Sequence, residues 1–181
     1  AMRLCDMLAA MLHAMRDGLT SSDPACAGAA RPLGNAMEDL GNAIRSYLAG
    51  LDPETANQRE MDRAEDILAF TTQMLHAEDI VERSLVPMVQ KMARQRLHLP
   101  QDLLAPVLSM TTQLTTNLNV CATVLLGTER GMTNPLNGQK DYFRDLEIEA
   151  TTAYFERLRK QTSDTPMITA VSYTHLRAHE T

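Results

Sequence analysis

The sequence predicts an all-α protein, and three observations support this prediction. Apolar residues recur at three- and four-residue steps along most of the chain, which is the spacing of amphipathic helices. No segment shows a convincing alternation of polar and apolar residues, the pattern of a strand. The chain has 12 Met, 3 Phe, 4 Tyr and no Trp, so its core must be filled with Leu, Met, Ala and Ile, which are compatible with helices.

Composition and charge narrow the class of protein. The chain has 181 residues, of which 44% are hydrophobic and 22% charged, as in one ordinary globular domain. A net charge of −6 argues against a general nucleic-acid surface. Cys5, Cys26 and Cys121 are few and far apart, which favours a reducing compartment over a disulfide framework. No uncharged apolar run approaches the roughly 18 residues needed to span a bilayer, so we expect the chain shown to be soluble.

Two amphipathic helices are expected at the start of the chain. The first covers 2–19 and the second 33–51, and each carries apolar residues on one face. The segment between them, 20–32, is rich in turn-forming residues, and Gly50 lies near the end of the second helix.

A long third helix follows. Residues 52–54, Asp-Pro-Glu, provide in order a capping side chain, a proline for the first turn and an early acid. A near-heptad apolar spacing continues to about Ala93, and Pro87 is expected to kink the helix rather than end it. Roughly 40 residues at ~1.5 Å each make a rod of about 60 Å. Such a helix is too long for one compact bundle and could belong to two bundles stacked end to end.

Two more helices and the start of another are expected in the second half. The fourth helix begins at Pro100 and ends near Gly127, and the fifth covers 134–158. Residues 162–164, Thr-Ser-Asp, resemble the cap of a sixth helix. The prediction is therefore five helices and a truncated sixth.

The last eleven residues, 171–181, read VSYTHLRAHET and break the helical pattern. This string is the translation of a transposase sequencing adapter, so we interpret it as read-through that is not native. His175 and His179 are thereby excluded as a metal-binding pair. We expect the natural chain to continue past Ala170, and Ala1 need not be its start.

No common catalytic motif occurs: there is no Gly-rich phosphate loop, CxxC pair, HExxH sequence or nucleophile elbow. Cys121 lies among apolar residues on a helix, which favours a small core residue over a reactive thiol. His13 and His76 have no second histidine three or four residues away, which disfavours metal ligation. We therefore assign no catalytic, cofactor-binding or metal-binding residue and predict that the chain is not an enzyme.

Three sets of acids are spaced by four residues, so that each set shares one helix face. They are Asp62 with Asp66, Glu78 with Glu82, and Asp141 with Asp145 and Glu149. Such acids could share a hard cation, but nearby arginines favour a solvated face. Glu78 is the exception, because it replaces an apolar residue within the stripe of the third helix. A carboxylate there should form an ion pair with a basic side chain, bind a cation, or be hydrated at an interface.

Several stretches occur in an order and spacing that a known family shares. They are MRLCDMLAAML at the start, NAIRSYLAGL, MLHAEDIVERSL, QLTTNLNVCATVL, LNGQKDYFRDLE and YFERLRKQTSD. Together they resemble the PhoU-like cytosolic domain that follows the membrane part of bacterial sodium/phosphate cotransporters, over essentially 2–170. The resemblance implies two tandem three-helix bundles, 1–93 and 94–170, that share the long third helix. The truncated sixth helix should leave an apolar groove in the second bundle.

Some PhoU proteins bind metal clusters through acids spaced by four residues. Asp79 matches the aspartate of that family motif, but Leu75 stands where the preceding acid is expected. Glu78 takes the place of the usual glycine, and Tyr154 that of the usual histidine. Because of these departures we assign no metal ligand.

The resemblance implies a regulatory module of a sodium-dependent inorganic phosphate cotransporter, acting through helix faces and not through catalysis. It would lie at the cytoplasmic face of the inner membrane as part of a larger membrane protein. Its partner would be the transmembrane part of the same polypeptide, or a second copy in a homodimer, and no nucleic acid is expected. Two alternatives stay open: a free-standing PhoU-type regulator of phosphate uptake and signalling, and a metal-binding helical bundle.

Overall fold

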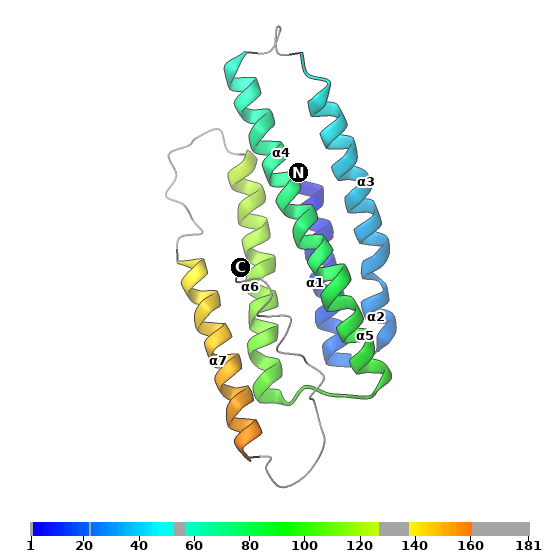
Figure 1. The fold of residues 1–181 in the computed structure, drawn as a ribbon, viewed down its shortest axis with the longest axis vertical. Helices are drawn as coiled ribbons and strands as arrows, with labels where there is room; N and C mark the ends of the chain where they lie inside the picture. The colour runs from blue at the N-terminus through cyan, green and yellow to red at the C-terminus, as the bar shows by residue number, and fades with distance from the viewer. Residues whose placement is uncertain (1, 22, 53–56, 127–137, 161–181) are drawn as a thin grey trace.

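The computed structural model describes residues 2–21, 23–52, 57–126 and 138–160 (Figure 1). Within these ranges the chain is built from helices and contains no strand, which confirms the predicted all-α class. The elements are α1 (Met2–Ser21), α2 (Pro24–Gly28), α3 (Ala30–Ala49), α4 (Gln58–Ile80), the π-helical turn η1 (Val81–Leu85), α5 (Val86–Arg94), α6 (Gln101–Leu126) and α7 (Gln139–Lys160).

The segment 20–32, whose composition indicates turns, contains the short helix α2. The side chain of Asp23 accepts a hydrogen bond from the N–H of Ala25 at 2.9 Å, and Pro24 occupies the first turn. Helix α3 follows directly at Ala30, earlier than its apolar pattern suggests. The same Asp-Pro pair that is typical of a turn therefore starts a helix here.

The start of the long helix lies later than predicted. Helix α4 begins after Asn57, whose side chain accepts a hydrogen bond from the N–H of Glu60 at 3.0 Å. The Glu60 carboxylate in turn accepts one from the N–H of Asn57 at 2.9 Å. This capping box satisfies two N–H groups that the first turn leaves without partners. Asp52 precedes the helix, and residues 53–56, on which the earlier start was predicted, lie outside the described residues.

The helical path continues past Pro87, as expected, from α4 through η1 to α5. In η1 the N–H of Val86 donates to the carbonyl of Val81, five residues earlier, which is the bond of a π turn. Proline has no N–H, and its ring crowds the carbonyl four residues before it. The wider turn lies directly before Pro87, so it accommodates the ring without ending the helix.

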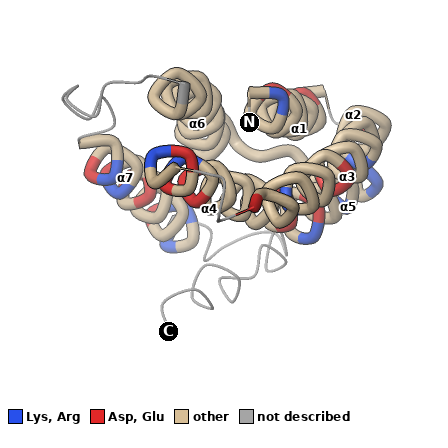
Figure 2. Tube along the Cα trace, turned by 90° about the horizontal axis from the view of Figure 1, so that it is seen from above, with Lys and Arg blue, Asp and Glu red and all other residues tan. Residues whose placement is uncertain are grey.

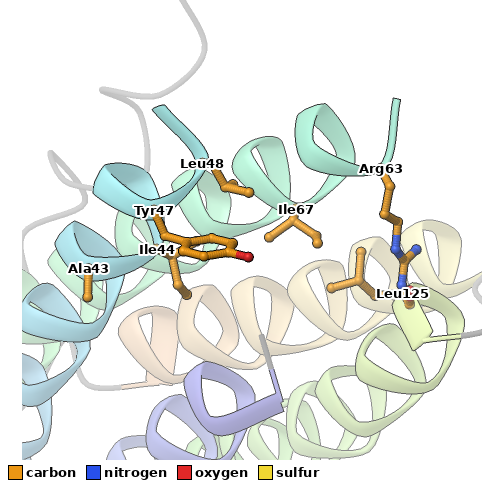
Figure 3. Close-up of a pocket in the computed structure, with 7 residues that line it drawn as sticks. All are labelled: Ala43, Ile44, Tyr47, Leu48, Arg63, Ile67 and Leu125. Atoms are coloured by element: carbon orange, nitrogen blue, oxygen red, sulfur yellow. Dashed lines mark hydrogen bonds between the residues drawn. The ribbon is translucent and has the colours of Figure 1, made fainter. Parts of the chain in front are cut away.

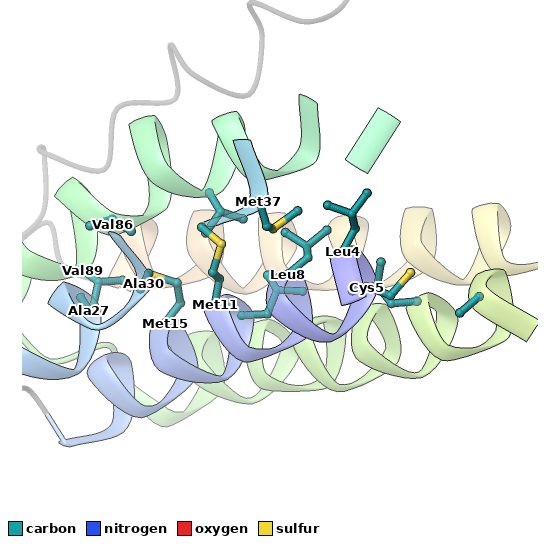
Figure 4. Packing of buried hydrophobic residues seen from close by; sticks show 14 residues of the cluster. Leu4, Cys5, Leu8, Met11, Met15, Ala27, Ala30, Met37, Val86 and Val89 are labelled. Carbon is teal, nitrogen blue, oxygen red and sulfur yellow. The ribbon is translucent and has the colours of Figure 1, made fainter. Parts of the chain in front are cut away.

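Helix α1 lies at the centre of the core. It packs against α2, α3, α4, α5 and α6, and viewed from above α1 and α6 form one layer over the other long helices (Figure 2). The large apolar residues of α1 that fill the core are less than 9% exposed: Leu4, Cys5, Leu8, Met11, Leu12 and Met15. Figure 4 shows Leu4, Met11 and Met15 among the residues of this cluster. The Met-rich core expected from the composition is therefore centred on one helix.

The helices lie side by side and not end to end. Helix α6 runs along α1, and Leu118 and Ala122 of α6 belong to the same buried cluster as the α1 residues (Figure 1). The long helix packs on α1, α2 and α3, so α1 provides the surface on which α6 packs. End-to-end stacking, which the length of the rod suggested, is therefore wrong for the described residues.

The division into bundles 1–93 and 94–170 stays a prediction. Helices α6 and α7 pack against each other as the first two helices of the second bundle would. The predicted start of the sixth helix at 162–164 lies outside the described residues, as does the segment 171–181.

Truncation of Met11 tests the central position of α1. Met11 is 0% exposed, whereas Leu114 on α6 is 41% exposed. We expect Met11→Ala to lower the free energy of unfolding by about 2–5 kcal/mol, because it removes buried methylene groups and leaves a cavity. Leu114→Ala, the control, should change it by less than about 1 kcal/mol. Urea unfolding followed by circular dichroism measures both, and equal losses would contradict this description of the core.

Candidate functional site

Of the acids with four-residue spacing, those on α7 lie on a solvent-exposed face, whereas Glu78 on α4 is buried. On α4, Asp62 accepts a hydrogen bond from Gln58 Nε2 at 2.8 Å. On α7, Asp141, Asp145 and Glu149 are exposed to solvent, as expected for a solvated face. In the part of the chain that the structure describes, no group of three or more His, Cys, Asp or Glu side chains is placed to hold a metal ion.

Glu78 is buried, because α4 directs it at α3. Its exposed fraction is 2%, which confirms that it lies within the buried stripe of the long helix. Gly34 of α3 lies opposite: a Cβ atom on residue 34 would be 2.6 Å from Glu78 Oε1 and 3.2 Å from Glu82 Oε2. The carboxyl groups of Glu78 and Glu82 therefore meet in the space that a side chain at position 34 would fill.

The environment of Glu78 favours its protonated form. Burial is the largest cause that raises the pKa of Glu78, from the ordinary value of 4.5 to about 7. A side-chain hydrogen bond with Glu82 acts in the same direction, and so do the negative charges of Glu82, Glu38 and Asp79. An ionised carboxylate can only accept hydrogen bonds. A hydrogen bond between two carboxyl groups therefore requires a proton on one of them.

Two arginines near this pair lie against Glu82 and Asp79. Arg31 Nε of α3 lies 3.7 Å from Glu82 Oε1, and Arg83 forms an ion pair with Asp79. Oε1 of Glu78 has no hydrogen-bond partner among the described residues. A buried polar atom without a partner costs free energy, so this position is unfavourable for the packing of α4 on α3.

The cysteines and histidines singled out in the sequence do not form a site. Cys5 of α1 is buried and Cys121 of α6 is half-buried. Burial raises the pKa of both thiols, and for Cys5 the nearby Cys121 adds to this effect. A raised pKa lowers the fraction of reactive thiolate. His13 on α1 and His76 on α4 are exposed.

An apolar hollow lies where the end of α3, the first half of α4 and the end of α6 meet (Figure 3). Its volume is about 460 Å³. Arg63 lies at one end of the hollow, beside Leu125, and Nη2 of Arg63 donates to the carbonyl of Leu125. Tyr47 at its rim is 73% exposed, the largest value among the exposed large hydrophobic residues of the described part. The lining residues are Ala43, Ile44, Tyr47, Leu48, Arg63, Ile67 and Leu125.

Helix α7 exposes apolar side chains on one face. Ile148 is 56% exposed, Phe155 43% and Leu158 42%, and their spacing by seven and three residues places them on the same side of the helix. The apolar groove that a truncated sixth helix was expected to leave in the second bundle stays a prediction, because residues 161–170 lie outside the described residues. Among the described residues no helix combines the length and apolar character required to cross a membrane.

Comparison with known proteins points to phosphate transport. Over 131 residues, 72% of this chain, the sequence is 28% identical to "Putative inorganic phosphate export protein YjbB" of Escherichia coli O157:H7. The match covers 24% of that protein, so the chain spans about a quarter of its length. No family model and no solved structure matches the chain. The similarity supports a relation to phosphate-transport proteins.

Sequence reasoning found Glu78 and its spacing to Glu82, but it missed Gly34. The signal that it could have used is the pattern of Gly34 and Gly41 on α3, spaced by seven residues, because both are buried and both face large side chains of α4. A glycine at such a position indicates close approach of a neighbouring side chain.

Substitution of Gly34 tests this contact. We expect Gly34→Ala to destabilise the chain by about 1–3 kcal/mol, because the new methyl group overlaps the carboxyl groups. Gly28→Ala is the control, since its Cβ would meet only Gln90 Nε2 at 3.9 Å. In the Glu78→Ala background the loss caused by Gly34→Ala should shrink or reverse, because alanine favours helices over glycine by about 1 kcal/mol. A loss of equal size in both backgrounds would show that the two residues do not interact.

Proposed function

We propose that this chain is the PhoU-like regulatory part of a sodium-dependent inorganic phosphate cotransporter, located at the cytoplasmic face of the inner membrane. The observation that carries the proposal is the similarity over 131 residues to a protein whose name describes it as an exporter of inorganic phosphate. The sequence resemblance over 2–170 and the all-α architecture also support it. Sodium dependence rests on the sequence resemblance.

The proposed mechanism is contact between helix faces, with no catalytic step. Sodium and phosphate bind in the membrane part of the polypeptide, and the helices described here transmit the intracellular state to it. The groups that the structure brings together, Glu78 and Glu82, are directed at α3 and not at an open cleft. This arrangement favours a role in the packing of helices over a role in substrate chemistry.

The apolar hollow at the end of α3, α4 and α6 is the contact that we propose for the membrane part. Its rim carries Tyr47, an aromatic residue that is 73% exposed. Exposed tyrosines beside apolar pockets are enriched at protein interfaces, where the ring is buried by the partner. Arg63 adds one positive charge to a lining that is otherwise mostly apolar.

The genomic sequence on both sides of this reading frame tests the first part of the proposal. We expect hydrophobic membrane spans within a few hundred residues upstream. If no such spans occur there, the cotransporter assignment fails, and the free-standing PhoU-type regulator becomes the better explanation.

Tyr47→Ala in the full-length transporter tests the contact. Truncation of an interface tyrosine removes about 1–2 kcal/mol of binding, which lowers the equilibrium constant of the contact by roughly 5- to 30-fold. The difference in phosphate flux between phosphate-starved and phosphate-fed cells should therefore shrink. Uptake and efflux of labelled phosphate are both measured, because the E. coli relative is named as an exporter. Ser46→Ala, at the neighbouring exposed position, is the control. If both variants regulate flux like the parent, the hollow is not the contact.

A further inference from the structure

The carboxyl groups of Glu78 and Glu82 connect three elements of the fold. Glu78 is on the last turn of α4, Glu82 is in η1, and both reach the backbone of α3 at Gly34. Glu78 is 2% exposed and Oε1 has no partner among the described residues. Ionisation of both groups would put the charge of Glu78, which is 2% exposed, against the backbone of α3, beside the charge of Glu82, whose side chain is 28% exposed.

We propose that the Glu78–Glu82 pair is a proton-binding site, and that loss of its proton loosens the packing of α3 on α4 and η1. This inference concerns the folded chain itself and goes beyond the function proposed above. A proton fits the site better than a metal ion does, since the space over Gly34 is filled by the carboxyl oxygens. Within the described ranges no third ligand is placed to complete a metal site.

The charged groups around Glu78 do not neutralise its carboxylate, so binding of a proton is the best way to remove the buried negative charge. Helix α3 presents Glu38, whose negative charge disfavours ionisation of Glu78, and Arg31, which lies 3.7 Å from Glu82 and not on Glu78. On the α4 side, Asp79 also disfavours ionisation and is paired with Arg83 of η1.

The other elements near this region offer no charge from their buried faces. The buried residues of α1 are Leu4, Cys5, Leu8, Met11, Leu12, Met15 and Gly18, and those of α5 are Val86, Val89, Met92 and Ala93. The buried residue of α2 is Ala27. Protonation therefore neutralises Glu78 where no cation from α1, α2 or α5 is buried beside it.

Loss of this proton should affect the π turn, because Glu82 lies within it. Relative to an α-helix, a π turn accommodates an extra residue, so its formation or loss changes the register of the helix after it. Glu82 is inside η1, and α5 follows directly. When both carboxyl groups are ionised, their repulsion acts across the junction of α4 and η1. The turn and its contact with α3 are thus the place where the packing should loosen first.

The direction of the pH dependence follows from the proton count. The pKa of Glu78 is about 7 in the folded chain against an ordinary value of 4.5. Between these values the folded state holds a proton that the unfolded state has lost, so stability falls as pH rises through this window. The stabilisation by this proton is complete below pH 4.5 and is fully lost above the folded pKa of about 7, where Glu78 is ionised in both states.

Unfolding of the 181-residue chain between pH 5 and pH 8 tests the proposal. The equilibrium constant for unfolding of the parent should rise by about 10- to 100-fold over this range, since a tenfold difference in proton affinity between the folded and unfolded chain changes this constant tenfold. Glu78→Gln, which cannot ionise, should remove most of this rise and be more stable than the parent at pH 8. Glu65→Gln, an exposed acid on the same helix, should keep the parent's pH profile.

Two further measurements keep the test decisive if Glu78→Gln does not fold. Carbon-13 NMR of the glutamate carboxyl groups in the parent should show one group that titrates near pH 7, with loss of amide protection in α3 and η1 above that pH. Unfolding at pH 8 is repeated with Mg²⁺ or Ca²⁺. The proposal is overturned if all glutamates titrate below about pH 5, if the parent and Glu78→Gln share one pH profile, or if a divalent cation restores the stability lost at pH 8.

Discussion

The packing of α1 into the middle of the bundle is the contact on which the rest of the structure depends. Its buried residues, among them Leu4 and Met11, contact helices from both halves of the chain. A helix that is apolar over more than one narrow stripe can bury surface against several neighbours at once. Because α1 takes this place, both the long helix and α6 pack on it, and the two groups of helices lie next to each other.

Close approach between α3 and the long helix is made possible by glycine. A Cβ atom at Gly41 would lie 2.6 Å from Leu75, just as one at Gly34 would overlap Glu78. One of these contacts is apolar and the other brings a carboxyl group into the core. The contact of Gly34 with Glu78 contributes less to stability than that of Gly41 with Leu75, since burial of a charged carboxylate costs free energy unless the charge is neutralised. A protein that retains Glu78 here therefore keeps a position whose free energy changes with pH, directly beside the π turn.

The similarity to a phosphate-transport protein and the buried carboxyl group of Glu78 beside Glu82 are independent findings. The similarity to the E. coli protein supports the first, and the geometry of α3, α4 and η1 supports the second. A regulatory helical module needs an element whose packing responds to the cell interior, and interfaces between packed helices switch between discrete arrangements. We propose the Glu78 region as such an element and the hollow beside Tyr47 as the surface that contacts the membrane part.

The sequence by itself determined the all-α class, the approximate extent of the long helices but not α2, the continuation of the longest helix past Pro87, and the presence of Glu78 within a buried stripe. It did so because helical periodicity and capping act over a few residues. Only the tertiary structure decided that α6 packs on α1, that Glu78 faces Gly34, and that η1 is a π turn. Periodicity states which face of a helix is buried but not which neighbour covers it, and the pKa of Glu78 depends on that neighbour because burial and the nearby carboxyl groups come from the packed helices together.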